Sequence, residues 1–107
     1  KAAQYYGEAA SMKDNADFYR KQAVALMVAE DYKGAIAAFD KALNAKPKKE
    51  GNIYLGLGEA HFYLENWKKS YVAFNKAKET KSSARTAEGW LGYVEDTAKR
   101  KGVDVKS

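Results

Sequence analysis

A segment that occurs twice along the chain is the feature that most constrains how it folds. "EDYKGAIAAFDKAL" (30–43) aligns with "ENWKKSYVAFNKAK" (65–78) at an offset of 35 residues. The aligned pairs are Asp31 and Asn66, Tyr32 and Trp67, Ala35 and Ser70, Phe39 and Phe74, and Ala42 and Ala77. Leu57-Gly58 also recurs as Leu91-Gly92. Repeats of this length are typical of folds in which one supersecondary unit stacks on the next, because no unit buries its apolar face alone.

Apolar residues recur at three- and four-residue intervals along most of the chain, which is the spacing of an amphipathic helix. This periodicity predicts long helices over 16–30, 32–47, 51–65, 67–81 and 83–102, and a shorter one over 1–12. Asn15 is the predicted N-cap of the first long helix, and Pro47 and Gly102 are stop signals. No alternating strand pattern is present. The predicted fold class is therefore all-α, with about six helices.

Composition restricts the functions that this chain can have. Its 107 residues suffice for one small domain. The absence of cysteine excludes disulfides, thiolate zinc sites and cysteine nucleophiles. The net charge of +5 is compatible with nucleic acid or an anionic surface. However, the lysines are spread along the chain and lie mainly on loops and on the second helix of each pair, so nucleic-acid binding is not expected. No apolar run is long enough for a transmembrane helix.

The stretch "YLGLGEAHFYLENW" (54–67) has features of a phosphate-binding loop, but it fails the tests for one. Gly56 and Gly58 are two apart, as at the start of a dinucleotide-binding loop. The third glycine of that motif is replaced by His61, and no strand is predicted before it. Gly58 is interpreted instead as a close contact between helices, and Gly56 as incidental.

The same stretch also lacks the groups that catalysis needs. His61 is the only histidine, and one histidine does not supply the several ligands of a zinc site. Glu59 does not face His61 on a helix, whereas Glu65, four residues on, is within reach of the imidazole. Ser70 has no base with the required third partner. The chain is therefore expected to be no enzyme, with no cofactor, no metal site and no small-molecule substrate.

The repeated spacing resembles the tetratricopeptide repeat (TPR), a helix–turn–helix unit of about 34 residues. The second repeat carries the family pattern at Tyr54, Leu57, Gly58, His61, Ser70, Phe74 and Ala77, and the first carries it at Tyr19, Ala23, Ala35, Phe39, Ala42 and Pro47. The first repeat departs from the pattern at Gln22 and Leu26, and Ser82 stands where the second repeat would have proline.

This resemblance implies a domain organisation. The whole of 1–107 is expected to be a single TPR domain, a right-handed α-solenoid of antiparallel helix pairs. Its expected parts are the second helix of a truncated leading repeat (1–12), two repeats (16–49 and 51–84), a C-terminal capping helix (85–102) and a tail (103–107).

The resemblance also implies a binding function. In TPR arrays the first helix of each pair lines a concave groove that receives peptides or protein segments. The groove positions carried over to this chain are Arg20, Val24, Met27, Asn52, Leu55, Glu59, Phe62, Tyr63, Trp90 and Tyr93, with Asp17, Val28, Thr86 and Gly89 beside them. Aromatic side chains gathered on one exposed face favour partner recognition. The expected function is a non-enzymatic protein–protein interaction scaffold that is part of a larger bacterial protein.

One specialised TPR function is not expected. Some TPR domains grip a C-terminal carboxylate with a clamp of lysine, asparagine and arginine side chains. Arg20 and Asn52 are isolated candidates for such a clamp, but Val24 and Glu59 stand where it would have asparagines. Binding of chaperone tails is therefore not predicted.

Two alternatives and a location complete the expectations. The chain is alternatively an assembly module that self-associates through its end helices, or binds nucleic acid or an anionic surface through its positive charge. The stretch 56–102, under half of the chain, resembles the C-terminal part of bacterial TPR proteins of TonB energy-transducing systems, and the feature that carries this resemblance is the cap sequence "AEGWLGY" (87–93). That resemblance implies a periplasmic location, with the cytoplasm as the alternative.

Overall fold

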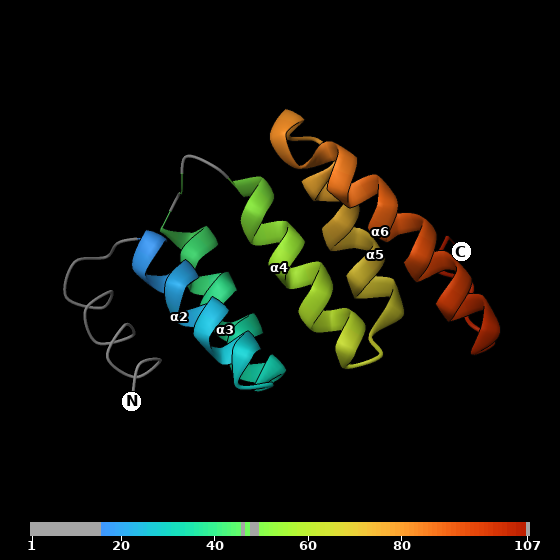
Figure 1. Ribbon diagram of the computed structural model, residues 1–107, viewed down its shortest axis with the longest axis horizontal. Coiled ribbons are helices and arrows are strands. Elements are labelled where there is room, and N and C mark those ends of the chain that lie inside the picture. The colour runs from blue at the N-terminus through green and yellow to red at the C-terminus, as the bar shows by residue number, and fades with distance from the viewer. Residues whose placement is uncertain (1–15, 46, 48–49, 107) are drawn as a thin grey trace.

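The computed structural model describes residues 16–45, 47 and 50–106 (Figure 1). In this part of the chain every regular element is a helix: α2 (Ala16–Val28), α3 (Tyr32–Asn44), α4 (Glu50–Tyr63), α5 (Trp67–Ala77) and α6 (Lys81–Arg100). The prediction of an all-α fold is confirmed, with five helices described where about six were expected. The sixth helix, predicted at 1–12, lies outside the described residues. So does Asn15, the predicted N-cap of the first long helix.

The helices are arranged as two hairpins and a final helix. Connections of three residues join α2 to α3 and α4 to α5, and each of these pairs packs closely along its length. We call α2–α3 the first hairpin and α4–α5 the second. α3 packs against α4, and α6 packs against both α5 and α4. In Figure 1, α2, α4 and α6 lie towards the viewer, with α3 and α5 behind them. We call these two surfaces the first-helix face and the second-helix face.

The turns of the two hairpins have the same backbone conformation. Glu30 and Glu65, 35 residues apart, both have a φ of 61°. The Glu30 amide donates to the Met27 carbonyl (3.0 Å), as the Glu65 amide donates to the Phe62 carbonyl (3.0 Å). Because a left-handed residue ends a helix, α2 and α4 end two residues before the predicted boundaries at 30 and 65. The sequence repeat is thus a repeat of backbone geometry.

The second helices of the hairpins begin at aligned residues but are capped differently. The Asp31 carboxylate accepts a hydrogen bond from the Gly34 amide (3.0 Å). Asn66, the aligned N-cap of α5, makes no side-chain hydrogen bond of this kind. α3 and α5 end at Asn44 and Ala77, three and four residues before the predicted boundaries.

The last helix, predicted over 83–102 with a capping helix at 85–102, spans Lys81–Arg100, and the predicted stop glycine Gly102 lies just beyond its end. Gly102 has a φ of 80°, in the left-handed region that glycine adopts without steric cost. The Val103 amide donates back to the Ala98 carbonyl (2.9 Å), which satisfies a carbonyl at the end of α6. The chain beyond Gly102 therefore reverses its direction.

The core contains two clusters of buried side chains. The first lies between α2, α3 and α4 and includes Phe39, Ile53 and Leu57. The second comprises Phe74, Leu91 and Val94, so it joins α5 to α6. Fully buried alanines lie on facing helices, which lets the helices approach closely: Ala23, Ala35, Ala42, Ala60, Ala77, Ala87 and Ala98.

Gly56 is a packing position, and its interpretation as incidental was wrong. A Cβ atom on Gly56 would overlap the end of the Phe39 ring, which reaches across from α3. A Cβ atom on Gly58 would lie 2.6 Å from the Phe74 ring, so the close contact predicted there is present. The contact at Gly56 joins the first hairpin to the second. Gly56 and Gly58 of α4 therefore each make room for a phenylalanine ring.

Candidate functional site

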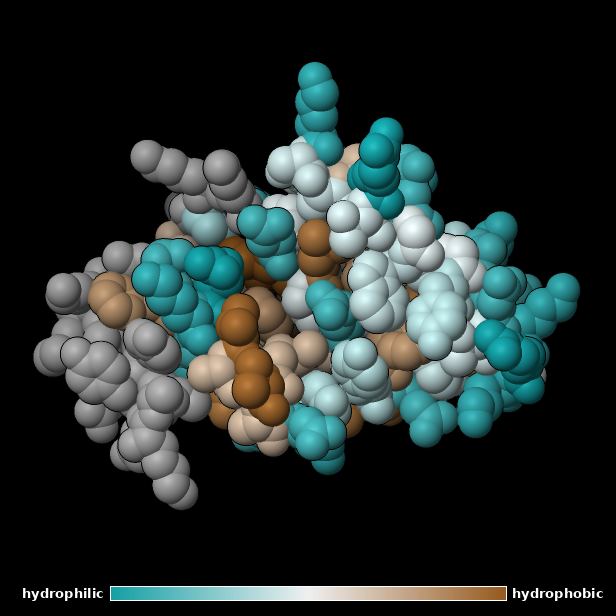
Figure 2. Space-filling view, viewed as in Figure 1, coloured by the Kyte–Doolittle hydropathy of each residue, from teal (hydrophilic) through white to brown (hydrophobic). Residues whose placement is uncertain are grey.

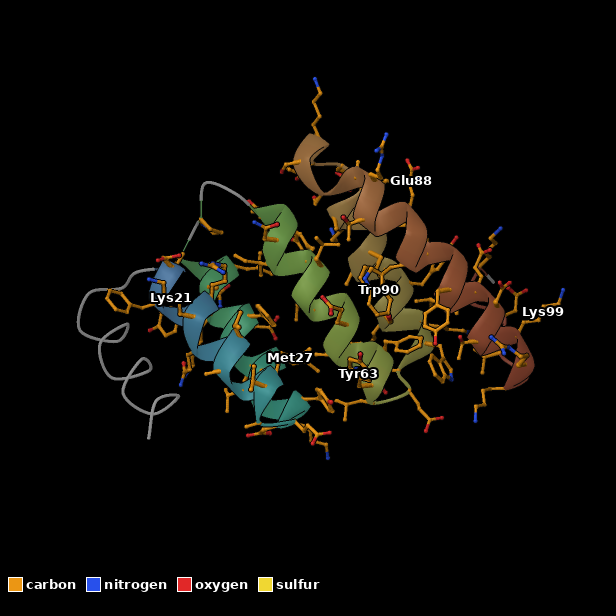
Figure 3. All side chains as sticks on the ribbon, viewed as in Figure 1. Lys21, Met27, Tyr63, Glu88, Trp90 and Lys99 are labelled. Carbon is orange, nitrogen blue, oxygen red and sulfur yellow. The ribbon has the colours of Figure 1, made fainter. Side chains whose placement is uncertain are left out.

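The residues predicted to line a groove lie on the first-helix face, and none is fully buried. Arg20, Met27, Leu55, Glu59, Phe62 and Trp90 are half-buried, and Val24, Asn52, Tyr63 and Tyr93 are exposed. Figure 2 shows apolar side chains over α2 on this face and paler side chains over α4 and α6. Met27, Tyr63 and Trp90, labelled in Figure 3, come from these three helices.

The structure gathers the aromatic members of this set around Phe62. Its ring centroid lies 5.1 Å from that of Tyr93, 5.4 Å from that of Trp90 and 5.7 Å from that of Tyr63. Trp67, at 5.2 Å, is a further neighbour. These centroid distances are those of favourable aromatic pairs. We call these five residues the aromatic cluster.

The aromatic cluster has a packed side and an exposed side. The Trp90 ring is stacked on Phe74, with centroids 5.0 Å apart and planes 9° apart. Phe62 and Trp90 pack against the second core cluster, so they hold α4 and α6 together. Tyr63 and Tyr93 are 52% and 54% exposed. Of the aromatic cluster, chiefly Tyr63 and Tyr93 are therefore accessible to a partner.

Sequence reasoning missed one aromatic residue that joins this surface. The Tyr32 ring stacks on Tyr63 with centroids 5.0 Å apart, which links the start of α3 to the end of α4. The available signal was the alignment of Tyr32 with Trp67, which itself belongs to the aromatic cluster. Both are the first residues of second helices, and both turn their rings towards α4.

The α2 part of the first-helix face is apolar and open. Val24 is 45% exposed and Val28 is 82% exposed. Met27 packs against the first core cluster. Exposed valines on a helix next to exposed tyrosines form an extended apolar surface, which is unusual where no partner binds.

The polar residues of the predicted groove are not all brought together. The Arg20 guanidinium is paired with Asp17 (3.0 Å), and Lys21 pairs with the same carboxylate (3.3 Å). The hydrogen bond from Arg20 is the main cause that holds the pKa of Asp17 below its usual value. Arg20 is therefore engaged within the first turns of α2. Asn52 lies at the start of α4, away from the aromatic cluster at that helix's other end.

Glu59 is the one acidic group of the predicted groove on α4, and it is half-buried. Burial raises the pKa of its carboxyl group above the usual value. Among the described residues it forms neither a hydrogen bond nor an ion pair. A half-buried carboxylate without a cation is a point at which a basic group of a partner would be favoured.

The residues that resemble catalytic groups are used in packing. The Ser70 hydroxyl is buried and donates to the Gly58 carbonyl at 2.8 Å. Nδ1 of His61 lies 3.4 Å from the side-chain Nδ2 of Asn66, so this ring nitrogen neighbours Asn66, while Glu65 was only expected to be within its reach. Burial, and then the charge of Lys69, lower the pKa of His61, while Asp40 opposes this shift.

The described residues offer neither a metal-binding group of side chains nor a helix that could span a membrane. Over 16–45, 47 and 50–106, no group of three or more His, Cys, Asp or Glu side chains is placed to hold a metal ion. In the same ranges no helix combines the length and the apolar character needed to cross a membrane.

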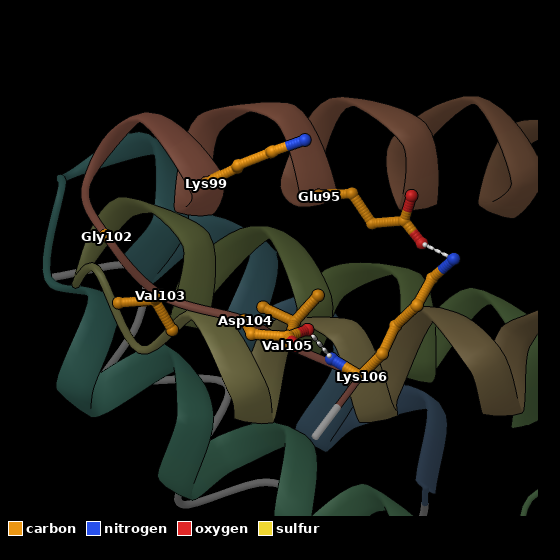
Figure 4. A pocket seen from close by; sticks show the side chains of 7 residues that line it. All are labelled: Glu95, Lys99, Gly102, Val103, Asp104, Val105 and Lys106. Carbon is orange, nitrogen blue, oxygen red and sulfur yellow. Dashed lines mark hydrogen bonds and ion pairs between the residues drawn. The ribbon is translucent and has the colours of Figure 1, made fainter.

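A hollow of about 480 Å³ lies where the chain folds back after α6 (Figure 4). Two of its charged groups, Glu95 and Lys106, are paired with each other. Lys106 Nζ lies 3.0 Å from Glu95, which also accepts a hydrogen bond from the Tyr71 hydroxyl (2.9 Å). These bonds, the one from Lys106 first, lower the pKa of Glu95. Val105 packs against the second core cluster. The hollow is thus a consequence of how this segment covers α5 and α6.

Comparison of the chain with protein-family models, with curated proteins and with solved structures gives no match.

Proposed function

We propose that this chain is a TPR-type α-solenoid that binds a segment of a partner protein on its first-helix face. Antiparallel helix pairs would follow one another in a right-handed superhelix, with 103–106 covering its last pair. The matching turns at Glu30 and Glu65 support the repeat, because two segments 35 residues apart share both sequence pattern and backbone conformation.

One observation carries the binding proposal. The exposed rings of Tyr63 and Tyr93 belong to a fixed aromatic cluster, and the exposed side chains of Val24 and Val28 lie on the neighbouring first helix. A rigid aromatic surface loses little conformational entropy when a partner binds. The segment is expected to supply apolar side chains for these residues and a lysine or arginine for the Glu59 carboxylate.

A selection of peptides from a random library displayed on phage tests this proposal. Peptides that bind the intact chain should be rich in apolar residues and contain lysine or arginine. Val28→Asp combined with Tyr93→Ala should weaken a selected peptide by about a hundredfold, because both side chains lie in the central contact. Fluorescence anisotropy of the labelled peptide measures this change.

The matched control is Val72→Asp, which changes a 54% exposed valine on the second-helix face in the same way. It should leave the affinity of the selected peptide unchanged. If both variants bind as the wild type does, or if Val72→Asp alone weakens binding, the first-helix face is not the site.

The alternative of an assembly module has less support at the C-terminal end. Val105 packs against the second core cluster, and the Glu95–Lys106 ion pair holds this segment in place. Stacking of another copy on α6 would have to displace it. Light scattering over a range of concentrations tests this alternative, which requires a mass that rises with concentration. A bacterial, periplasmic location is part of the proposal and depends only on the resemblance of 56–102, which the cap sequence at 87–93 carries.

A further inference from the structure

A second hollow, of about 360 Å³, lies between α3 and α5, with α4 as its floor. Its lining is mostly apolar and includes Leu43, Leu57 and Val72, one from each helix. Val72 of α5 lines this hollow and is 54% exposed. A volume of this size is sufficient for one or two side chains.

The hollow faces away from the aromatic cluster. Tyr54, Leu57 and His61 of α4 contribute to it, and these residues recur at the three- and four-residue spacing of one helical stripe. Leu55, Glu59 and Phe62 form a stripe roughly opposite, because successive residues of a helix are about 100° apart. The two surfaces are therefore separate and lie on opposite sides of α4.

Three ammonium groups surround the hollow. Lys68, Lys69 and Lys76 line it, and Asp40 is the one acidic residue among the lining side chains. Within the described part of the chain none of the three lysines forms an ion pair. The Lys76 ammonium lies 5.7 Å from the centroid of the Tyr54 ring. The surface thus combines an apolar floor with a positive rim.

We propose that this hollow is a second docking site, which takes an acidic segment of a partner protein. One apolar side chain of the segment inserts beside Val72, and carboxylates on either side of it pair with Lys69 and Lys76. Charge complementarity decides the occupant: three lysines without ion pairs favour carboxylates, and the exposed apolar floor favours a side chain rather than a free anion. The hollow is shallow and open, as a site for a protein segment should be. The protein would then hold two partners on opposite faces.

Two labelled peptides test the charge of the site. One is built from Glu, Leu and Gly, and its counterpart has Lys at every Glu position. Anisotropy titrations use the variant with Val28→Asp and Tyr93→Ala, whose first-helix face no longer binds a basic apolar peptide. They should show binding of the acidic peptide only, and this binding should weaken as salt is added. Equal binding of both peptides, or of neither, overturns the proposal.

A pair of double variants locates the site. Lys69→Glu with Lys76→Glu should weaken the acidic peptide about tenfold or more, since two charge pairs become repulsive. Lys33→Glu with Lys81→Glu is the control: it changes the net charge equally at exposed positions outside the hollow. It should reduce affinity by about twofold at most. Equal losses in the two double variants mean that binding follows overall charge, and no loss in the first means that the hollow is not used.

Two single variants separate this site from the first-helix face. Val72→Asp should abolish binding of the acidic peptide, and Val28→Asp should leave it unchanged. The opposite expectation holds for a peptide that binds the first-helix face, so either proposal can fail while the other stands. Circular dichroism checks that each variant keeps its helices. If Val28→Asp weakens the acidic peptide as much as Val72→Asp does, the second site is excluded.

Discussion

In the first hairpin the Phe39 ring ends against Gly56 of the following helix, whereas Phe74 of the second hairpin lies between Gly58 and Trp90. Both rings contact the next first helix in the chain, and Phe74 also lies against Gly58 of its own hairpin. In the first case a missing side chain makes room for the ring, and in the second an indole stacks on it. The same repeat position therefore joins consecutive units in two ways, one through backbone and one through an aromatic pair.

The two hairpins also differ in how they use polar groups. Ser70 donates to the Gly58 carbonyl, while Ala35, its aligned residue, has no group to do so. Asp31 caps α3, while Asn66 lies beside His61. Equivalent backbones thus tolerate different side-chain contacts, which shows that the hairpin geometry does not depend on any one of them.

The largest expected effect tests the two phenylalanines against each other. Phe74→Ala should cost about 4–5 kcal/mol of unfolding free energy, since it opens a cavity and removes the stack on Trp90. Phe39→Ala should cost about 1 kcal/mol less because it has no such stack. Urea denaturation at constant m-value measures both losses. An equal or larger loss for Phe39→Ala would mean that the Trp90 stack adds no stability.

Replacement by alanine should change the stability of the protein in opposite directions at Gly56 and at Gly89. Gly56→Ala should destabilise the protein by roughly 1–2 kcal/mol, because overlap with Phe39 outweighs the better helix propensity of alanine. Gly89→Ala in α6 meets no atom within 4 Å and should stabilise it by about 0.5–1 kcal/mol. Thermal melts of both variants check this. A stabilising Gly56→Ala would restore the interpretation of that residue as incidental.

Exchange of the aligned residues Ala35 and Ser70 tests the hydrogen bond of the second hairpin. Ser70→Ala should cost about 1 kcal/mol, the usual net value of a buried hydrogen bond. Ala35→Ser should be close to neutral if its hydroxyl can donate to a carbonyl of α2 in the same way. Chemical denaturation of the two variants gives the comparison. A large loss of stability for Ala35→Ser would show that the helices approach each other more closely at Ala35 than at Ser70.

The hairpin turns should respond alike. Glu30→Gly and Glu65→Gly should each stabilise the protein by about 0.5–1 kcal/mol, because glycine adopts a φ of 61° without the steric cost that glutamate bears. The two gains should be equal and additive, since the turns are separate. Melting temperatures of the single and double variants measure this. Unequal gains would indicate that one turn is held by further contacts.

The smallest effect concerns Glu59, whose aligned residue in the first hairpin is Val24. Burial raises the pKa of Glu59. The folded protein is therefore more stable when Glu59 is protonated than when it is ionised. This stabilisation is complete below the unfolded pKa of about 4.3 and is lost as the pH rises through the folded pKa. Glu59→Gln should therefore be more stable than the wild type at pH 7 by roughly 0.3 kcal/mol, after screening by solvent.

Melts of Glu59→Gln and the wild type between about pH 3 and 7 test the sign, because the difference should vanish at the acidic end of this range. A difference that grows towards low pH would contradict the assigned cause. Glu59→Gln should also weaken a basic peptide on the first-helix face, which Val24→Ala should do less.

Local pattern predicted much of this fold. Three- and four-residue spacing placed all five described helices, and Gly102 placed the end of the last one. The offset of 35 residues predicted two equivalent hairpins. These features depend on contacts within one or two helical turns, or on a repeat that the sequence itself displays.

The helix ends within the hairpins were less accessible to sequence reasoning. Glutamate does not favour a positive φ, so no local sequence signal predicted the left-handed conformation of Glu30 and Glu65. The packing of the next helix requires the chain to reverse at these residues. Tertiary contacts therefore decided a boundary that propensity placed two residues later.

What the sequence by itself determined is the set of helices, their pairing and the face on which the candidate binding residues lie. Only the tertiary structure decided that Gly56 receives the Phe39 ring, that Phe62 and Trp90 are partly used in packing, and that Tyr32 stacks on Tyr63. The physical reason is the same in each case. These contacts join residues on different helices, and their geometry follows from how closely the backbones approach, which helical periodicity does not specify.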